Sequence, residues 1–458
     1  MPSVVAVPPG DAIAVCPGAV KRPTAGEGDV AYDPQFDPDA TVIEALQRGI
    51  VEGGQGGRLV PLDGGAATNL GAPFALTTDV VAAEPKRLEA YSTQTEPALA
   101  TGAVFQHLAD GDLRGVAATP CIAPSTEAWI VAGSTEPGSS ARLVLVNAGL
   151  TNVTASLELW DAAGPVEAVG LTGLVIPPLT QRAVLLEGFV GDAARLASHV
   201  TASGGELAVF LQHSRLEGLV QGGTELAVAG EAPAYEVVVP GLSLTGSDYD
   251  APRASALRVL NPGAAPANVT VELWGPDGVT TLPGLEEAVV GAGLVTDLSL
   301  AGLPAGVYTA VLTSDQLVVA AGLVLRTAEP EAPEEFAWAA SARGAERAFL
   351  ALPSSDLTAQ LVLGAGEAAS VSVVPIGMNA TAGEAVIIEL EGGQSRALDL
   401  AELGGDDSTV ALELTWTGGA ARAAALTVVA QDPEGQMISV VVPSGRWAQP
   451  TELPVYPR

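Results

Sequence analysis

The chain has 458 residues, which is enough for three or four domains of about 150 residues each. Apolar residues make up 48% of it but aromatic residues only 4%, so its cores must consist of Val, Leu, Ala and Ile. Twenty Lys and Arg stand against 53 Asp and Glu, and the net charge of −33 excludes nucleic acid and disfavours anionic lipid surfaces as partners. No apolar run reaches the roughly 18 residues that a transmembrane helix needs.

The first region, residues 1–125, is predicted to be a β-rich domain, because short apolar runs alternate with Gly and Pro turns. One segment within it predicts a helix. Asp39–Gly49 begins with a capping residue, has helical spacing of Val42, Ile43 and Leu46, and ends on Gly. The N-terminus has no basic region and is interrupted by prolines, so no signal peptide is expected in this chain.

The two cysteines, Cys16 and Cys121, lie near the two ends of this region. Each occurs in a turn context beside proline, which favours a disulfide that closes the domain. In the chain-entropy model such a loop would stabilise the fold by about 4–5 kcal/mol. The alternative is a pair of buried free thiols. The sequence has neither a Cys-x-x-Cys motif nor a Cys/His cluster, so no metal site is predicted.

One β-hairpin pattern occurs twice further along the chain. Residues 142–164 read RLVLVNAGLTNVTASLELWDAAG, and residues 256–278 read ALRVLNPGAAPANVTVELWGPDG. Each copy is an alternating strand, an Asn/Gly turn and a second strand that ends in Leu-Trp. The Asn-to-Trp spacing is 13 residues in both copies. The repeat predicts tandem immunoglobulin-like sandwiches with four equivalent marker residues: Asn147, Trp160, Asn261 and Trp274.

These patterns divide the remainder of the chain into units. Residues 126–233 and 234–328 are predicted to be two β-sandwich repeats, and residues 336–447 a third, diverged repeat that has lost the Leu-Trp ending. An acidic, proline-bearing linker is expected at 329–335 and an extended tail at 448–458. The predicted fold class is therefore all-β, with tandem immunoglobulin-like sandwich domains after an N-terminal β-rich domain.

The marker tryptophans allow two interpretations. Aromatic rings stack on sugar faces, which would make Trp160 and Trp274 ligand contacts. Their equivalent places in two repeats instead favour a structural role, in which each ring covers the end of a sandwich core.

The search for catalytic, cofactor-binding and metal-binding residues finds none. The histidines His107, His199 and His213 have no zinc-ligand spacing, and hydrogen-bonded structural roles are expected for the last two. A nucleophile elbow, a P-loop and a dinucleotide-binding motif are all missing from the sequence. The acidic stretch from Asp33 to Asp39 lacks the alternate-position spacing of a calcium loop and contains two prolines.

Three segments have residues in common with a known family. They are Gly111–Cys121 (GDLRGVAATPC), Glu127–Thr135 (EAWIVAGST) and Arg142–Gly149 (RLVLVNAG), followed by the second hairpin. The chain thereby resembles an uncharacterised family of actinobacterial envelope proteins, a domain of unknown function. The resemblance is weakest in residues 20–100 and after 330. It implies a secreted or membrane-tethered β protein, often encoded near envelope glycosyltransferases, and it implies no activity.

Two classes of function remain. The first is a non-enzymatic extracellular or cell-envelope protein, whose stacked sandwiches scaffold or contact envelope glycan or a protein partner. The alternative is an accessory module or a carboxylate-based hydrolase of cell-wall polysaccharide, which needs two carboxylates facing each other in a cleft. We predict the first, without a catalytic residue, a cofactor or a nucleic-acid partner. The sequence predicts no export segment of the kind that this location requires in this chain.

Overall fold

The protein is an all-β ring of sandwich units, as the sequence predicts for its fold class. The computed structural model describes residues 3–22, 41–218, 220–251, 253–326, 334–354, 356–419, 421–432, 435–445, 447 and 451–455. Within these ranges the structure is built of strands and turns, with a short 3₁₀ turn at Leu186–Gly188. None of the described residues forms a helix that is long and apolar enough to cross a membrane.

Unit 1 is a sandwich of two four-stranded sheets. The first sheet has the order β2 (Ala12–Cys16), β7 (Lys86–Ala90), β4 (Gly57–Pro61), β5 (Thr68–Leu70). The second has the order β6 (Phe74–Val80), β3 (Val42–Glu52), β8 (Leu99–Leu108), β9 (Gly115–Pro120). A disulfide joins Cys16 at the end of β2 to Cys121 just after β9, which confirms the predicted bond.

The helix predicted at Asp39–Gly49 is wrong. Val42–Glu52 form β3, which pairs with β6 on one side and β8 on the other. Val42 and Ile43 are 55% and 47% exposed, so the spacing that suggested an apolar helix face does not mark a buried face. The β-branched residues Ile50 and Val51 are fully buried at the centre of the sheet, where such side chains pack well. Pairing with strands distant in the chain therefore determines this segment, in spite of the helical spacing of its apolar residues.

Units 2 and 3 repeat this arrangement. The first sheet of unit 2 has the order β10 (Glu127–Ile130), β16 (Ala197–Ser203), β12 (Val153–Asp161), β13 (Gly164–Val166), with β14 (Leu174–Ile176) beside β12. Its second sheet has the order β15 (Thr180–Leu185), β11 (Ser139–Asn147), β17 (Ala208–Glu217), β18 (Val220–Val228). In unit 3 the long strand β25 (Gly306–Arg326) takes the places of both β16 and β17. Its other strands are β19 (Ala234–Leu244), β20 (Ala256–Leu260), β21 (Ala267–Gly275), β22 (Gly278–Thr280), β23 (Ala288–Val290), β24 (Val295–Ser299) and β26 (Glu335–Ala340).

Unit 4 has the same strand order. Its first sheet has the order β27 (Arg347–Ala351), β32 (Thr409–Gly418), β29 (Ala369–Gly377), β30 (Val386–Leu390). Its second sheet has the order β31 (Gln394–Asp399), β28 (Thr358–Ala365), β33 (Arg422–Asp432), β34 (Gly435–Val441). The order of strands within the two sheets also matches that of unit 1. The region that the sequence set apart is therefore built on the same topology as the repeats.

Two features at the predicted boundaries differ from the expectation. β26 pairs with β25 along its whole length, so residues 335–340 belong to unit 3 and the expected start of the last repeat at 336 lies inside this strand. Residues 329–333 of the predicted linker lie outside the described residues.

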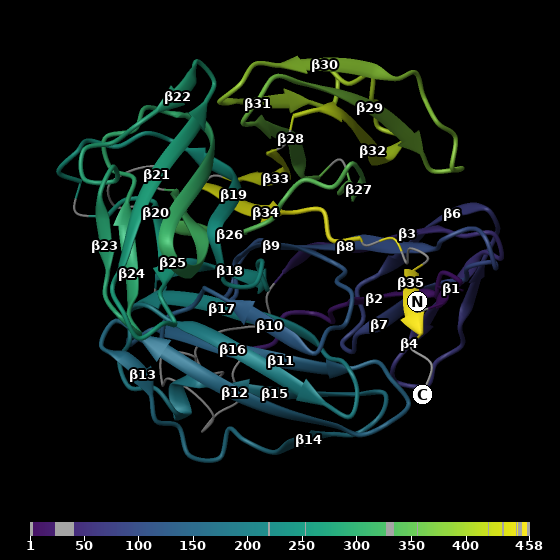
Figure 1. The fold of residues 1–458 in the computed structure, drawn as a ribbon, viewed down its shortest axis with the longest axis horizontal. Helices are drawn as coiled ribbons and strands as arrows, with labels where there is room; N and C mark the ends of the chain where they lie inside the picture. The colour runs from purple at the N-terminus through teal and green to yellow at the C-terminus, as the bar shows by residue number, and fades with distance from the viewer. Residues whose placement is uncertain are drawn as a thin grey trace.

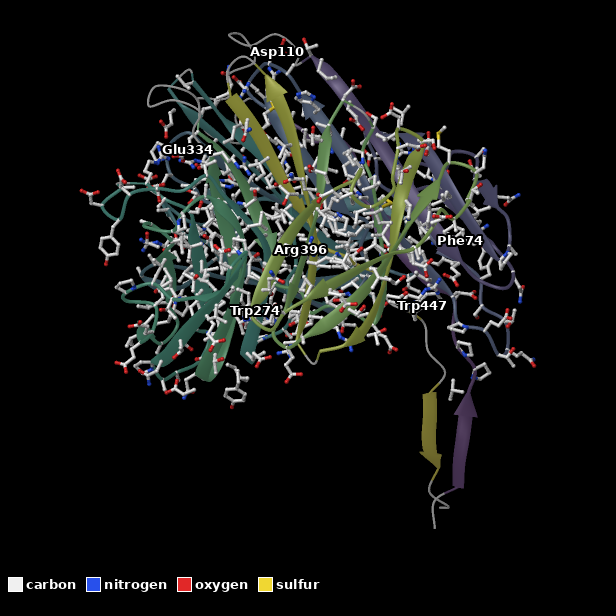
Figure 2. All side chains as sticks on the ribbon, turned by 90° about the horizontal axis from the view of Figure 1, so that it is seen from above. Phe74, Asp110, Trp274, Glu334, Arg396 and Trp447 are labelled. Carbon is white, nitrogen blue, oxygen red and sulfur yellow. A yellow bond between two sulfur atoms is a disulfide. The ribbon has the colours of Figure 1, made fainter. Side chains whose placement is uncertain are left out.

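In the tail, Thr451–Val455 form β35, which pairs with β1 (Ser3–Val7). Figure 2 shows this two-stranded ribbon standing apart from the sandwiches.

The four units close a ring around their innermost strands. β9, β18, β26 and β34 lie at the centre of Figure 1, and each contacts the inner strands of the units before and after it. A buried ion pair joins Arg114, just before β9, to Glu335 of β26, with side chains 1% and 2% exposed. On β34, the Ser439 hydroxyl lies 2.9 Å from both a carboxyl oxygen of Glu225 on β18 and the carbonyl oxygen of Ala118 on β9.

Glu225 is the most unusual of these central groups. It is 1% exposed, and burial raises its pKa well above the ordinary value, so the carboxyl group is held in its neutral form. Its Oε1 accepts a hydrogen bond from the backbone N–H of Leu226 at 2.8 Å, while Oε2 has no partner among the described residues. Ionising this group would leave an uncompensated charge at the point where four units meet.

Glu225→Gln is expected to stabilise the ring at alkaline pH. Because the folded-state pKa is raised, the stability that Glu225 contributes is complete below its unfolded-state pKa and is lost as pH rises through the folded-state value. The amide cannot ionise, so its advantage should grow with pH and reach about 1–3 kcal/mol, the usual cost of an uncompensated buried polar group. Urea unfolding from about pH 5 to 9 measures this. Exposed Glu206→Gln is the matched control; an equal pH dependence in both variants would contradict the assignment.

Candidate functional site

A depression of about 570 Å³ lies at one end of the ring axis. Its wall is made by the segments that follow the four inner strands, one from each unit. They are residues 120–125, 229–232, 341–345 and 442–445, with part of β10 beside them. Because every unit contributes, the depression exists only when the ring is closed.

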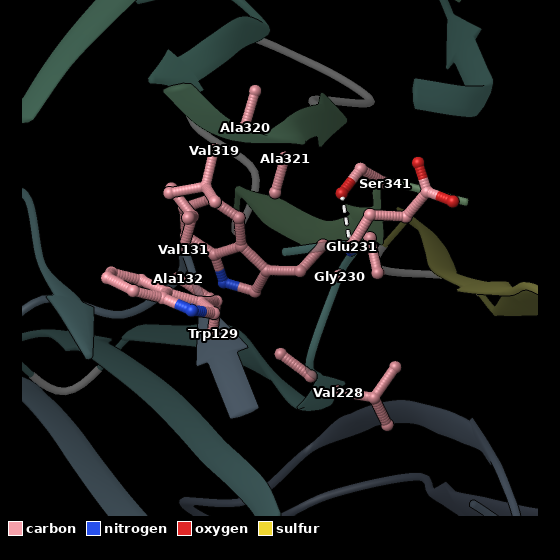
Figure 3. Close-up of a pocket in the computed structure, with 13 residues that line it drawn as sticks. Trp129, Val131, Ala132, Val228, Gly230, Glu231, Val319, Ala320, Ala321 and Ser341 are labelled. Carbon is pink, nitrogen blue, oxygen red and sulfur yellow. Dashed lines mark hydrogen bonds between the residues drawn. The ribbon is translucent and has the colours of Figure 1, made fainter. Parts of the chain in front are cut away.

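The wall of the depression consists mainly of Ala, Pro and Gly, and its few polar groups are already held in place. The backbone N–H of Glu231 donates to the Ser341 hydroxyl at 3.0 Å (Figure 3). The Ser444 hydroxyl donates to the carbonyl of Cys121 at 2.6 Å. At the rim, Arg343 forms a 3.1 Å ion pair with Glu231, and half of its side chain remains exposed. Small side chains leave the backbone open to a ligand.

A cluster of one histidine, two carboxylates and an indole lies beside this rim. Trp129 and His199 face each other on β10 and β16, with ring centroids 3.8 Å apart and planes 11° from parallel. His199 Nε2 lies 2.9 Å from Glu127, and Nδ1 lies 2.9 Å from Glu158 on β12. The indole N–H of Trp129 also donates to Glu127, at 2.9 Å. Sequence reasoning missed the pairing, because the three strands are far apart in the chain.

This cluster does not provide an open catalytic pair. The imidazole of His199 fills the space between Glu127 and Glu158, so no substrate atom can lie between the two carboxylates. Both carboxylates are also more than half exposed. No group of three or more His, Cys, Asp or Glu in the described ranges has the geometry of a metal site. The acidic stretch Asp33–Asp39 lies outside those ranges.

The other two histidines are interior groups. His213 on β17 is 2% exposed, and burial lowers its pKa well below the ordinary value. It accepts a 3.1 Å hydrogen bond from the indole N–H of Trp338 in unit 3, consistent with a neutral ring. His107 on β8 is 7% exposed. Neither lines the depression.

Below the wall of the depression, two indoles close off the interior. Trp129 and Trp338 line a void of about 10 Å³ together with Val319, Ala320 and Ala321 of β25. Figure 3 shows Trp129 and these three residues of β25. A void of this size holds about one water molecule. Any ligand of the depression must therefore bind at its surface and not enter the seam between units 2 and 3.

The marker asparagines make identical hydrogen bonds. In both, the side-chain N–H₂ donates to the carbonyls of the residues 4 and 29 positions ahead, at 2.8 and 2.9 Å from Asn147 and at 2.7 and 3.1 Å from Asn261. The side-chain oxygen accepts from the N–H two positions ahead, at 2.9 and 3.0 Å. Both residues are 0% exposed. Each therefore fixes the turn between β11 and β12, or between β20 and β21, to the edge strand β14 or β23. The two strands that this turn joins lie in opposite sheets and do not pair, so the β-hairpin predicted at 142–164 and 256–278 is wrong.

The two marker tryptophans are buried in different surroundings. Trp160 is 8% exposed and stacks on Trp129 at 5.6 Å, in an apolar cluster that continues into unit 3. Trp274 is 3% exposed and packs with Ala423 of unit 4; a side chain at Gly366 would collide with its ring. The ring of Trp274 thus lies in the seam to the next unit, whereas the sequence suggested the end of its own core. Neither is a surface for a ligand.

The match of a family model to residues 76–401 spans units 2 and 3 and parts of units 1 and 4. The chain belongs to this family, the family of unknown function DUF5719. No curated protein matches the chain. The family match covers the lining of the central depression except for residues 442–445, which follow β34, and it agrees with the resemblance to an uncharacterised domain.

One solved structure is similar to the chain at a very low level. It is the crystal structure of Streptomyces avermitilis alpha-L-rhamnosidase complexed with L-rhamnose, at 10% sequence identity and a TM-score of 0.12. The alignment covers 96% of this chain and 57% of that chain, so the chain spans little more than half the length of the enzyme. A likeness this weak carries no argument about fold, activity or ligand.

Asn147→Ala and Asn261→Ala are expected to destabilise the protein equally, by about 1–3 kcal/mol each, because each leaves buried backbone groups without partners. Thermal unfolding of the two variants measures this. Exposed Asn152→Ala is the control and should stay within about 0.5 kcal/mol of the parent. A loss in only one of the two variants would refute the shared role.

Proposed function

We propose that the protein is a non-enzymatic protein of the extracellular space or cell envelope that binds envelope glycan in its central depression and scaffolds its neighbours there. The observation that carries the proposal is the depression of about 570 Å³ to which all four units contribute. Ligand sites in proteins occupy about 300–1,000 Å³. A chain that builds four copies of one unit and closes them around such a hollow has one surface that no single unit could offer.

The disulfide supports the proposed location. Cys16 and Cys121 are 0% and 1% exposed, and their bond joins residues 105 positions apart. Bonds of this kind form and persist in oxidising surroundings such as the cell exterior and are rare in the cytosol. The resemblance to actinobacterial envelope proteins points the same way, as does the membership in a family without an assigned activity.

The chemistry of the rim favours a neutral glycan over other ligands. Glu127, Glu231 and Arg343 can exchange hydrogen bonds with sugar hydroxyls, and Ser341 and Ser444 add hydroxyl groups to the wall. Apolar wall residues can lie against the carbon faces of a sugar. The overall charge of −33 opposes an acidic polymer at this site. A protein partner remains the second possibility for the scaffolding role.

Bulky substitutions in the wall test whether the depression binds glycan. Ala232→Trp and Ala345→Trp place an indole on exposed positions of the wall, so each should reduce binding of neutral cell-wall polysaccharide fragments at least about tenfold while folding is retained. Fluorescence anisotropy of labelled fragments measures the affinity. Ala162→Trp, on an exposed turn of unit 2, is the control and should bind like the parent. Equal affinity in all four proteins would reject the depression as the site.

The same fragments decide between binding and hydrolysis. Incubation with the parent should release no new reducing ends. Sustained release that disappears in Glu127→Gln or Glu158→Gln would replace the proposed function with a carboxylate-based hydrolase.

A further inference from the structure

One carboxylate at the rim of the central depression is tied to a histidine behind it. Glu127 and Trp129 of β10 both line the depression. Behind them, on the same face of the sheet, Trp129 pairs with His199 of β16, and His199 pairs with Glu158 of β12. His199 and Glu158 are not part of the wall, so they can act on a ligand there only through the two residues of β10.

The two polar contacts of His199 need two protons on its ring. Nε2 lies 2.9 Å from Glu127 Oε1, and Nδ1 lies 2.9 Å from Glu158 Oε2. A neutral imidazole donates from one nitrogen and presents a lone pair at the other. A lone pair that faces a carboxylate oxygen at this distance repels it. Both contacts are therefore hydrogen bonds only in the doubly protonated ring.

The indole of Trp129 suits that charged form. Its ring lies 3.8 Å from the ring of His199 with the planes 11° from parallel, and the face of an indole attracts a cation. The indole N–H donates to Glu127 Oε1, the same oxygen that His199 Nε2 contacts. Two donors thus hold this oxygen, whereas no hydrogen bond from the described residues reaches Oε2. Oε2 is the atom of Glu127 that can accept from a ligand hydroxyl.

The other charged groups near this cluster are already paired. Glu231 lines the small void below the depression and binds Arg343 at 3.1 Å. Arg258 stacks on Trp338, the second indole of that void, and binds Asp297 at 2.8 Å. The residues of β25 that line the void do not titrate: Val319, Ala320 and Ala321. Among the described residues, the two carboxylates on β10 and β12 are therefore the charged groups that contact the imidazole.

Unit 3 shows that the repeat does not need this histidine. The matching residues there are Val238 on β19, Val311 on β25 and Glu272 on β21, which pair in the same order. The two valines belong to an apolar cluster in the seam to unit 4. The topology thus accepts a valine where unit 2 has His199, and a valine has no proton to lose. Packing of the repeat therefore does not explain the histidine.

Loss of one proton from the ring ends one of its two hydrogen bonds. Trp129 still donates to Glu127 when His199 does not, whereas Glu158 has no other donor among the described residues. The remaining N–H is therefore expected at Nδ1, and the lone pair of Nε2 then faces Glu127. Repulsion from this lone pair displaces the carboxylate from the position in which both donors hold it.

We propose that doubly protonated His199 is a positioning residue of the glycan site, which holds the rim carboxylate of Glu127 for the ligand, and that glycan binding weakens as pH rises and the ring loses a proton. This inference rests on the proposed function for its ligand and adds the regulation of that same site.

NMR tests the positioning without a ligand. The chain has three histidines, and His199→Val, which installs the unit 3 residue, identifies the ring signal of His199. Trp129→Phe identifies the indole N–H signal of Trp129 in the same way. Over about pH 5 to 9, where histidines titrate, both signals should change with one midpoint, because both groups donate to Glu127 Oε1.

Two comparisons make this NMR result specific. His213 should not titrate in the same range, because burial lowers its pKa well below the ordinary value. In His199→Val the step in the Trp129 signal should vanish. A Trp129 signal that does not follow His199, or that still titrates in His199→Val, would overturn the positioning.

Binding of labelled neutral cell-wall fragments tests the regulation. The parent should bind them about three- to tenfold more weakly above the midpoint than below it, since one charge-assisted hydrogen bond to Glu127 is lost. His199→Val should bind with the weaker affinity at every pH. Exposed Glu272→Gln, which alters the counterpart of Glu158 in unit 3, is the matched control and should keep the pH step of the parent. An equal step in His199→Val would overturn the regulation.

These measurements separate failure of the regulation from failure of the proposed function. A parent that binds no fragment at any pH would overturn the proposed function, and the NMR step would then decide the positioning of Glu127 by itself. Binding of equal strength at every pH would keep the proposed function and overturn the regulation.

Discussion

Closure of the ring is the constraint on which the other features depend. The strands β9, β18, β26 and β34 can meet at one centre only if each sandwich turns its second sheet inward. The centre then buries Arg114 against Glu335 and encloses Glu225 beside Ser439. Buried charged or polar groups are costly unless they are paired or neutral, so these contacts specify which strands meet more than they add stability.

The seams follow from closure. In the seam between units 3 and 4, Trp274 packs with Ala423, and a side chain at Gly366 would collide with its ring. Between units 1 and 2, a hollow of about 320 Å³ lies where residues 17–21 and 83–84 of unit 1 approach the second sheet of unit 2.

The sequence allowed the strands and turns to be predicted, but not how the strands pair into sheets or how the units close into a ring. Alternation and turn residues identified the strands and turns around Asn147 and Asn261, but the two strands of each copy lie in opposite sheets and do not form the predicted hairpin. The helix predicted at Asp39–Gly49 failed because β3 is determined by pairing with β8, more than fifty residues away. The ring, the matching topology of unit 1 and the cluster of Glu127, His199 and Glu158 all depend on strands that are distant in the chain, which periodicity does not report.

The two ends of the chain strengthen the junction at which the ring is closed. Units 1 and 4 are the first and last, so no covalent connection passes directly between them. The Ser444 hydroxyl binds the Cys121 carbonyl, and β1 pairs with β35. Arg347 of β27 also reaches Glu52 of β3 at 3.1 Å. Because Cys121 is bonded to Cys16, the last unit holds a point that the disulfide has already fixed to the first sheet. The wall of the central depression at 442–445 therefore lies on a junction that hydrogen bonds, an ion pair, a strand pairing and the disulfide hold together, which would keep the shape of the proposed binding surface.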